Sequence, residues 1–156
     1  MKIEVLDTTL RDGAQAEGVT LSIDDKAECI RLFDDLKIDY IQAGPPLANP
    51  KDPHLLCDDP APTINSHLVA FGSTRHKNNL TDEDSALNML SLSKTQFVSV
   101  VGKSSVTQAE KVLQVSAQDN LKMIYDSIRF LCDRNKTVFF DAEHFFDGYE
   151  ESPDYA

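Results

Sequence analysis

The chain has 156 residues, of which 41% are apolar, so it can bury a core of about the size of one ordinary domain. Its 26 acidic and 15 basic residues give a formal net charge of −11, which makes nucleic acid and anionic membranes poor partners for its surface as a whole. No apolar run approaches the ~20 residues of a membrane span. The three cysteines, Cys29, Cys57 and Cys132, lack a C-x-x-C spacing and are typical of reduced, mostly buried thiols in a cytoplasmic protein.

Five short apolar runs are rich in β-branched residues and mostly lack the polar alternation of a half-exposed strand. This pattern is typical of strands that are buried on both faces. The predicted strands are Ile3–Leu6, Tyr40–Ala43, Leu68–Phe71, Phe97–Val101 and Thr137–Phe140.

Amphipathic helices are predicted between most of these strands, because an N-capping residue is followed three residues later by an acidic residue. The three predicted helix starts are Ser22 with Asp25, Thr81 with Asp84, and Ser116 with Asp119. The alternation of strand and helix predicts an α/β fold with a parallel sheet and right-handed crossovers.

The connection between the second and third strands breaks this rhythm. Six of the seven prolines fall between Pro45 and Pro62, which excludes one regular helix there and predicts a long irregular loop with at most a helical turn. The sequence has no low-complexity tract and no shift in composition that would mark a linker between domains. Residues 1–156 are therefore interpreted as a single domain.

Polar residues follow every predicted strand. The carboxyl ends of parallel strands lie on one side of an α/β fold, where catalytic groups gather, so these residues predict a site there. The polar segments are Asp7–Gln15, Gln42–Pro46, Gly72–Arg75, Gly102–Ser104 and Asp141–His144.

Three of these residues have a clear chemical use. Asp12 is a hard oxygen ligand suited to a divalent cation, and Arg11 offers a planar fork for a carboxylate or a developing oxyanion. Glu143 suits a general acid or base. The alternatives are an ordinary surface ion pair for Arg11 and Asp12, and a structural histidine at His144. Gly102–Ser104 is not a phosphate loop, because the glycine that the motif requires five residues earlier is absent.

Several blocks of the sequence resemble one family. They are LDTTLRDGAQAEG (6–18), GPPLANPKD (44–52), LVAFGSTR (68–75), VGKS (101–104) and DAEHFFDGY (141–149). Together they resemble the amino-terminal part of the citramalate synthases, a branch of the isopropylmalate and homocitrate synthase group of metal-dependent acyltransferases and lyases. The similarity runs nearly end to end of the chain.

The resemblance implies a fold and a reaction. The fold would be five β/α units of a (β/α)8 TIM barrel, with parallel strands in the order 1-2-3-4-5 and the last three strands lacking. The reaction would be a condensation of acetyl-CoA with pyruvate, a 2-oxo acid, to give citramalate for branched-chain amino-acid synthesis. A divalent metal, Mg²⁺, Mn²⁺ or Zn²⁺, would assist it.

The resemblance also implies a role for each matching residue. Asp12 matches the metal-binding aspartate, and Arg11 matches the catalytic arginine that binds and polarises the oxo group of the substrate. Gln15 matches a polar residue near the substrate. Glu143 matches an active-site glutamate, and Asp141 falls where relatives vary the residue that faces the small end of the substrate.

The chain also departs from the family pattern. The family completes its metal site with a His-x-His pair, which is absent here, and Gln42 stands where many relatives carry a glutamate. The metal site is therefore expected to be incomplete, and the isolated chain inactive. The sequence leaves open whether this chain is an excerpt of a longer protein, a truncated gene product or a decaying gene copy.

Two functional classes follow from these expectations. The first is the front part of a citramalate synthase-like acyltransferase, or of a relative with another 2-oxo acid, such as a 2-isopropylmalate synthase. The second is an inactive half-barrel that self-associates or binds a partner through the open edges of its first and fifth strands. A homo-oligomer is expected in either case.

Overall fold

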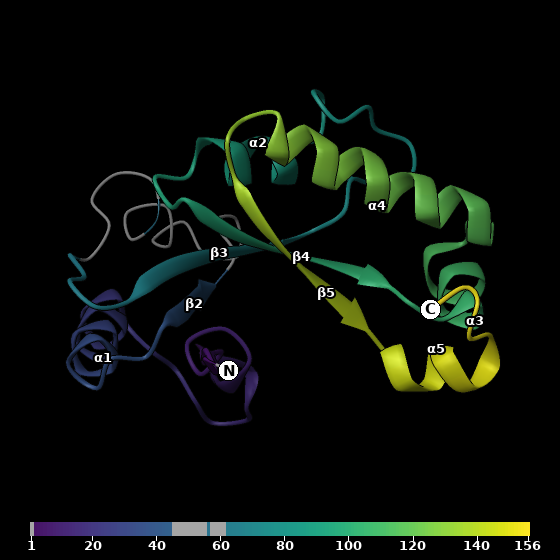
Figure 1. Ribbon diagram of the computed structural model, residues 1–156. Helices are drawn as coiled ribbons and strands as arrows, with labels where there is room; N and C mark the ends of the chain where they lie inside the picture. Colours follow the sequence, from purple (N-terminus) through teal and green to yellow (C-terminus); the bar gives the residue numbers. More distant parts are fainter. Residues whose placement is uncertain (1, 45–55, 57–61) are drawn as a thin grey trace.

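A five-stranded parallel sheet forms the centre of the structure, a computed structural model that describes residues 2–44, 56 and 62–156 (Figure 1). The sheet order is β1-β2-β3-β4-β5, and every neighbouring pair is parallel. This confirms the predicted order of the parallel strands and the curled sheet of a partial TIM barrel. The strands are β1 Leu6–Asp7, β2 Tyr40–Gly44, β3 His67–Ser73, β4 Phe97–Lys103 and β5 Thr137–Glu143.

The prediction of burial on both faces is wrong for the two outer strands. β1 has only two residues, and Ile3, which was assigned to the first strand, is 77% exposed and precedes it. Phe140 in β5 is also exposed. Each outer strand has a single neighbour in the sheet, whereas β2, β3 and β4 are flanked on both sides and are mostly buried.

Local capping explains where the first and the longest helix begin. Ser22 and Asp25 form the predicted capping box, in which each side chain binds the backbone N–H of the other residue. Ser116 likewise accepts a hydrogen bond from the backbone N–H of Asp119. The helices that follow these two caps are α1 Ile23–Asp35 and α4 Ala117–Cys132.

The helix α2, Ser85–Leu92, begins later than predicted. Its N-cap is Asp84, whose side chain accepts the backbone N–H of Leu87 at 3.1 Å, so Thr81 lies outside the helix. The second carboxylate oxygen of Asp84 also accepts the backbone N–H of His76 at 2.9 Å. This tertiary bond explains why Asp84 is the cap.

The ranges 2–44 and 62–156 also contain four short helical segments that were not predicted. They are η1 Gly13–Gln15, α3 Val106–Gln108, η3 Ala109–Leu113 and α5 Phe145–Glu151. Helix α5 docks closely on the segment after β4, since a Cβ atom at Gly148 would lie 2.2 Å from the Ser104 carbonyl oxygen. Glu151 accepts a hydrogen bond from the Ser105 hydroxyl at 2.7 Å, which fixes the other end of α5.

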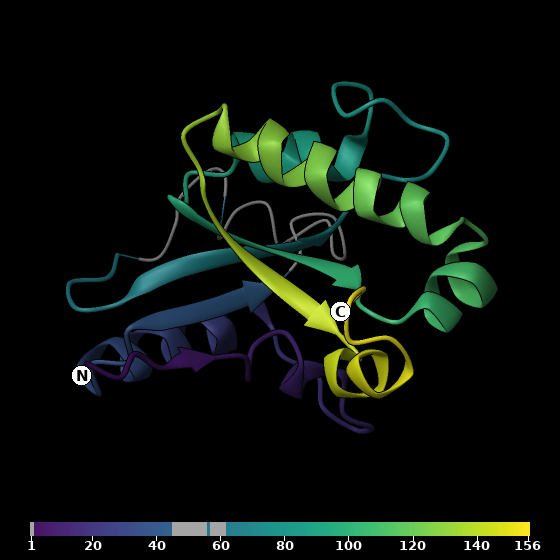
Figure 2. The ribbon, with the colours of Figure 1, turned by 45° about the vertical axis from the view of Figure 1, so that its right-hand side comes forward.

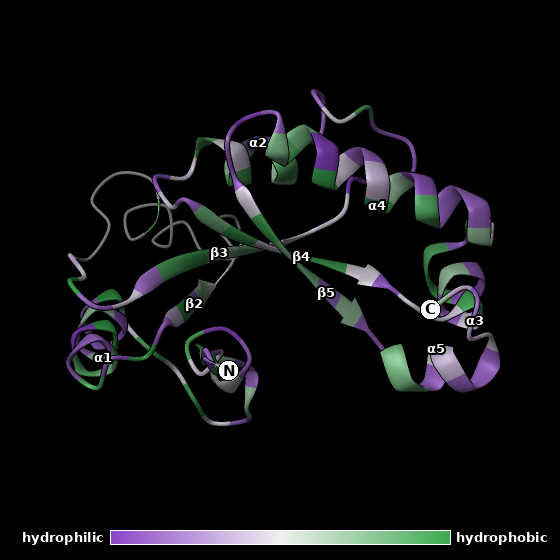
Figure 3. Cartoon of the chain, in the orientation of Figure 1, coloured by the Kyte–Doolittle hydropathy of each residue, from purple (hydrophilic) through white to green (hydrophobic). Residues whose placement is uncertain are grey.

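The hydrophobic core lies between the sheet and the helices on its outer side. Figures 1 and 2 show α2 and α4 covering one face of the sheet, and α1 packs beside β2. Helix α4 alternates between apolar and polar residues along its length, as expected for a helix with one buried side (Figure 3). The core includes Leu10, Ile30, Ile41, Ala43, Leu68, Ala70, Leu87, Leu90, Val98, Val100, Phe130 and Leu131.

A buried carboxylate holds the segment that leads into β3. Asp34 accepts hydrogen bonds from the backbone N–H groups of Ile64, Asn65 and Ser66 at 2.7–3.1 Å. Burial by itself would raise the pKa of Asp34, but these donors stabilise the charged form and lower the pKa below its ordinary value. Asp34 thus joins the end of α1 to the start of β3.

The thiols differ from the prediction. Cys132 is exposed at the end of α4, and Cys29 is partly exposed, so neither is a buried thiol. An irregular loop was predicted between Pro45 and Pro62, but of residues 44–62 the structure describes only positions 44, 56 and 62. Cys57 and most of the block 44–52 therefore lie outside the described residues. Within the described ranges, no helix is long and apolar enough to cross a membrane.

Candidate functional site

Aromatic rings line the amino-terminal end of the sheet face opposite α2 and α4. The ring centroids of Tyr40 and Phe97 lie 5.2 Å apart, and those of Tyr40 and Phe139 lie 5.0 Å apart. Tyr40 belongs to β2 and Phe139 to β5, strands that would be about 14 Å apart in a flat sheet. The sheet therefore curls toward this side, which we call the concave face.

Arg11 lies at the carboxyl end of the concave face and joins three strands. Its Nε donates to Gln42 Oε1 of β2 at 2.8 Å, and its guanidinium lies over the ring of Phe71 of β3, 4.2 Å from the centroid. Its Nη1 is 3.2 Å from Asp12 Oδ1, and its Nη2 is 3.6 Å from Asp141 Oδ2 of β5. The guanidinium thus connects the segment that follows β1 with residues of β2, β3 and β5.

The loop after β1 places Arg11 by local hydrogen bonds. The backbone N–H groups of Arg11 and Asp12 both donate to the Thr8 carbonyl oxygen, at 3.1 and 2.7 Å. The preceding side chain, Leu10, is buried in the hydrophobic core. Because this tight turn anchors Leu10 in the core, the next side chain, Arg11, is directed to the concave face.

A second ion pair lies beside the first. Lys103 of β4 binds the carboxylate of Glu143, its partner in the β4–β5 register. Asp141 and Glu143 are two residues apart on β5, so their side chains lie on the same face about 7 Å apart. His144 Nε2 is 3.9 Å from Glu143 Oε1. The carboxyl end therefore carries two cations and three carboxylates on one face.

The structure brings together most of the residues that the sequence predicted for the site. Arg11, Asp12 and Asp141 form one ion-pair cluster. Glu143 lies two residues beyond Asp141 on β5 and pairs with Lys103. Gln15 is exposed in η1, and its side chain makes no hydrogen bond to another described residue. The catalytic, substrate-binding and metal roles of these residues remain predictions.

Three contacting residues had no assigned role in the sequence analysis. Lys103 was counted only as a polar residue near a strand end, Phe71 only as part of a strand, and Gln42 as a polar residue that stands where many relatives carry a glutamate. The period of two along each strand is the signal that places Phe71 and Lys103 on the face of Asp141 and Glu143, through the β3–β4 and β4–β5 registers. The contacts of Gln42 and Phe71 with Arg11 depend on the curvature of the sheet, which the sequence does not display.

A complete metal site is not formed by the described residues. They contain no group of three or more His, Cys, Asp or Glu side chains that could hold an ion. Asp12, whose side chain is 63% exposed, could supply one carboxylate oxygen, and this oxygen is already near Arg11. One carboxylate leaves a divalent ion mostly hydrated, so these side chains by themselves do not fit a tightly bound metal.

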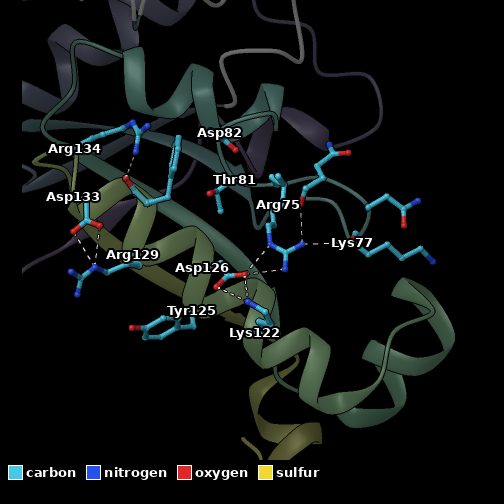
Figure 4. Close-up of a pocket in the computed structure, with 14 residues that line it drawn as sticks. Arg75, Lys77, Thr81, Asp82, Lys122, Tyr125, Asp126, Arg129, Asp133 and Arg134 are labelled. Carbon is cyan, nitrogen blue, oxygen red and sulfur yellow. Dashed lines mark hydrogen bonds and ion pairs between the residues drawn. The ribbon is translucent and has the colours of Figure 1, made fainter.

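A larger pocket than any at this end of the concave face lies on the outer side of the sheet. It has a volume of about 740 Å³ and lies between α4 and the loop that follows β3 (Figure 4). Arg75 pairs with Asp126 at 3.0 Å and donates to the Asn79 carbonyl oxygen at 3.1 Å, and Arg129 pairs with Asp133 at 3.0 Å.

These ion pairs give the pocket a structural role. Burial disfavours the charged form of Asp126, but its hydrogen bonds with Lys122 and Arg75 outweigh that effect and lower its pKa. Arg75 therefore fastens the loop to α4. A smaller pocket of about 440 Å³ is lined by Asp141–Asp147, at the carboxyl end of β5.

Comparison with known proteins places the chain in a family. A family model described as HMGL-like matches residues 2–152. The chain is 42% identical over 156 residues to the (R)-citramalate synthase of Aquifex aeolicus and 39% identical over 155 residues to that of Sulfolobus acidocaldarius, and it spans 30% of the length of each. It is 32% identical over 142 residues, 91% of its length, to the 2-isopropylmalate synthase of Shouchella clausii, of which it spans 27%. The chain therefore belongs to the HMGL-like family.

Proposed function

We propose that this chain forms the front part of the catalytic barrel of a cytoplasmic acyltransferase that condenses acetyl-CoA with pyruvate to give citramalate. Five relatives named (R)-citramalate synthase are 37–42% identical to it, whereas three named 2-isopropylmalate synthase are 25–32% identical. The observation that carries the proposal is the position of Arg11, whose guanidinium lies between Asp12 and Asp141 at the carboxyl end of the sheet.

The reaction makes a specific electrostatic demand. The methyl carbon of acetyl-CoA loses a proton to a base and attacks the carbonyl carbon of a 2-oxo acid, so negative charge develops on the carbonyl oxygen, which then takes up a proton. Water afterwards hydrolyses the thioester and releases CoA. Donors that are fixed in place before the attack stabilise the charge on the carbonyl oxygen most effectively. Arg11 offers two Nη groups in a fixed plane, which suits both this oxygen and the neighbouring carboxylate of the 2-oxo acid.

The other residues complete the proposal. Glu143 is the candidate acid or base, and Lys103 holds its carboxylate on the concave face. Asp141 would border the small end of the 2-oxo acid, and Gln15 would contact it from η1. The proposal includes a divalent metal, Mg²⁺, Mn²⁺ or Zn²⁺, with Asp12 as one ligand and its other ligands outside the described residues.

A chimera tests this proposal. The 156 residues would replace the matching segment of the Aquifex aeolicus relative, and release of CoA thiol would be followed with acetyl-CoA, pyruvate and Mg²⁺ or Mn²⁺. We expect turnover that is lost in Asp12→Ala and in Arg11→Gln, with the substitution Asp35→Asn on the exposed side of α1 as the control. A folded chimera that turns over equally well with Arg11→Gln would contradict the proposal. Faster turnover with 2-oxoisovalerate than with pyruvate would favour the 2-isopropylmalate synthase alternative.

A second candidate function is self-association as a half-barrel without catalysis. It is favoured by the apolar side chains that α5 exposes, among which Phe146 is 82% exposed. Phe145, Phe146 and Tyr149 also form ring contacts with one another on this helix. Sedimentation of the 156-residue chain tests it. A dimer that dissociates in Phe146→Asp would support it, and a monomer at high concentration would contradict it.

A further inference from the structure

Lys103 and Glu143 form an ion pair on the same face of the sheet as Arg11. They are partners in the β4–β5 register, and Lys103 Nζ donates to Glu143 Oε2. The side chain of Lys103 is only 15% exposed, whereas that of Glu143 is 41% exposed. The ammonium group is therefore held largely out of water, where its electrostatic interactions are stronger, beside a carboxylate that remains open to a substrate.

The two oxygens of the Glu143 carboxylate have different surroundings. Oε2 is occupied by Lys103. Oε1 accepts no hydrogen bond from the residues that the structure describes, and it lies 3.9 Å from His144 Nε2, which is beyond hydrogen-bond length. Oε1 is therefore the oxygen that can take up a proton while Lys103 stays bound to Oε2.

The proposed reaction places negative charge on two oxygens in turn. Loss of a methyl proton from acetyl-CoA gives an enolate, whose charge lies on the thioester oxygen. Attack on the 2-oxo acid then moves the charge to the carbonyl oxygen of that substrate. Because Arg11 suits the second oxygen, the first needs a cation of its own.

The spacing of the two cations suits these two oxygens. Arg11 Nη2 approaches Asp141 of β5 at 3.6 Å. Lys103 binds Glu143, two residues further along the same strand, so the two pairs are about 7 Å apart. After the attack the two oxygens belong to carbons that are separated by one methylene carbon, and a cation reaches its oxygen over about 3 Å. One pair of bound substrates can thus contact both cations.

We propose that Lys103 is a catalytic residue that stabilises the enolate of acetyl-CoA, while Glu143 Oε1 removes the methyl proton. The electrons of the broken C–H bond form the C=C bond of the enolate, and the carbonyl π pair of the thioester moves to its oxygen. Glu143 loses its charge in this step, so the ammonium of Lys103 becomes available to the enolate oxygen. The enolate carbon then forms the new C–C bond, and the alkoxide beside Arg11 takes up the proton from Glu143.

This inference rests on the proposed function, and exchange of the acetyl-CoA methyl protons with solvent isolates the enolate step. The chimera with the Aquifex aeolicus relative is incubated in D₂O with acetyl-CoA, Mg²⁺ or Mn²⁺, and oxamate. Oxamate is an analogue of pyruvate whose amide carbonyl resists attack. Mass spectrometry follows the deuterium that enters the methyl group.

Two substitutions separate the charge of Lys103 from its position. Lys103→Gln keeps a hydrogen-bond donor for Glu143 but removes the charge, and Lys103→Arg keeps both. We expect exchange to fall at least about hundredfold in Lys103→Gln and to stay within about tenfold of the unmodified chimera in Lys103→Arg. The control Lys111→Gln makes the same change at an exposed position in η3 and should leave exchange unaltered.

The inference and the proposed function fail in different ways. Citramalate formation together with full exchange in Lys103→Gln would overturn the role of Lys103 and leave the proposed function intact. Exchange that depends on Lys103 in a chimera that forms no citramalate would support this role and count against pyruvate as the substrate. A folded chimera that neither exchanges the methyl protons nor forms citramalate would overturn both.

Discussion

The two faces of the sheet are made from alternate residues of the same strands, and they do different work. On β2, Ile41 and Ala43 enter the hydrophobic core on the outer side, while Gln42 between them reaches Arg11 on the concave face. The outer face gains its stability from apolar burial, and the concave face gathers paired charges. A strand with a period of two can therefore support packing and chemistry at neighbouring positions without conflict.

A second difference runs along the concave face itself. Its amino-terminal end carries the contacting rings of Tyr40, His67, Phe97 and Phe139. Its carboxyl-terminal end carries the ion pairs of Arg11 and Lys103. This division matches the general rule for (β/α)8 barrels, in which catalytic groups lie at the carboxyl ends of the strands and the opposite end serves stability.

The purified 156-residue chain is expected to show no citramalate formation, although it retains Arg11, Asp12 and Glu143. The described residues supply one candidate metal ligand, and catalysis needs its groups fixed to roughly 0.5 Å. The assay follows CoA thiol with acetyl-CoA, pyruvate and Mg²⁺ or Mn²⁺. Turnover that disappears in Asp12→Ala would mean that the chain completes its own site, and the account would be wrong on this point.

The outer face is expected to hold most of the stability. Leu131→Ala should lower the free energy of unfolding by about 2–5 kcal/mol, because Leu131 is 0% exposed and its removal leaves a cavity. Leu121→Ala, on the same helix but 43% exposed, is the matched control and should have a much smaller effect. Urea unfolding measures both, and equal losses in the two variants would show that burial on the outer face is not the main source of stability.

Asp34 should make stability depend on pH at the acidic end. Asp34→Asn weakens the acceptor of three backbone N–H groups and should lower the free energy of unfolding by about 1–3 kcal/mol at pH 7. Because folding lowers the pKa of Asp34, its contribution is fully present above its unfolded pKa of about 3.9 and is lost as the pH falls through the folded pKa.

The variant should therefore lose part of the acid sensitivity of the unmodified chain below about pH 4. Asp35→Asn is the control, since Asp35 is the exposed neighbour on α1. Unfolding by urea at a series of pH values measures this dependence. An unchanged slope in Asp34→Asn would show that the carboxylate does not stabilise the fold through its charge.

The charged end of the concave face should contribute little to stability. Asp141→Asn is expected to change the free energy of unfolding by no more than about 0.5 kcal/mol, since the pair with Arg11 is partly exposed and Asp12 remains beside the guanidinium. Urea unfolding is again the measurement. A loss above about 2 kcal/mol would show that this end is a structural element, and the separation between the faces would fail.

The features that depend on local chemistry could be predicted from the sequence. The capping residues Ser22 and Ser116 were recognised because their partners lie three residues away. The parallel sheet, and with it the clustering of Arg11 with Asp141 at one end, followed from the alternation of strands and helices, whereas the strand order followed from the family resemblance.

Features that depend on distant partners could not be predicted. The choice of Asp84 over Thr81 as a cap depends on the additional bond from His76. Gln42 and Phe71 both contact Arg11, which lies 31 residues before the first and 60 residues before the second. These contacts depend on the curvature of the sheet. The close docking of Gly148 has no signal in a single sequence.

The most direct test of the account is a map of the backbone and side-chain ¹H–¹⁵N signals that shift when pyruvate is added to the 156-residue chain with Mg²⁺. We expect shifts at the carboxyl end of the concave face, centred on Arg11, Asp12 and Gln42. We expect none in the outer pocket of Arg75 and Arg129 and none among the rings at the amino end. Shifts that centre on the outer pocket, or that are absent from Arg11 at saturating pyruvate, would contradict this expectation.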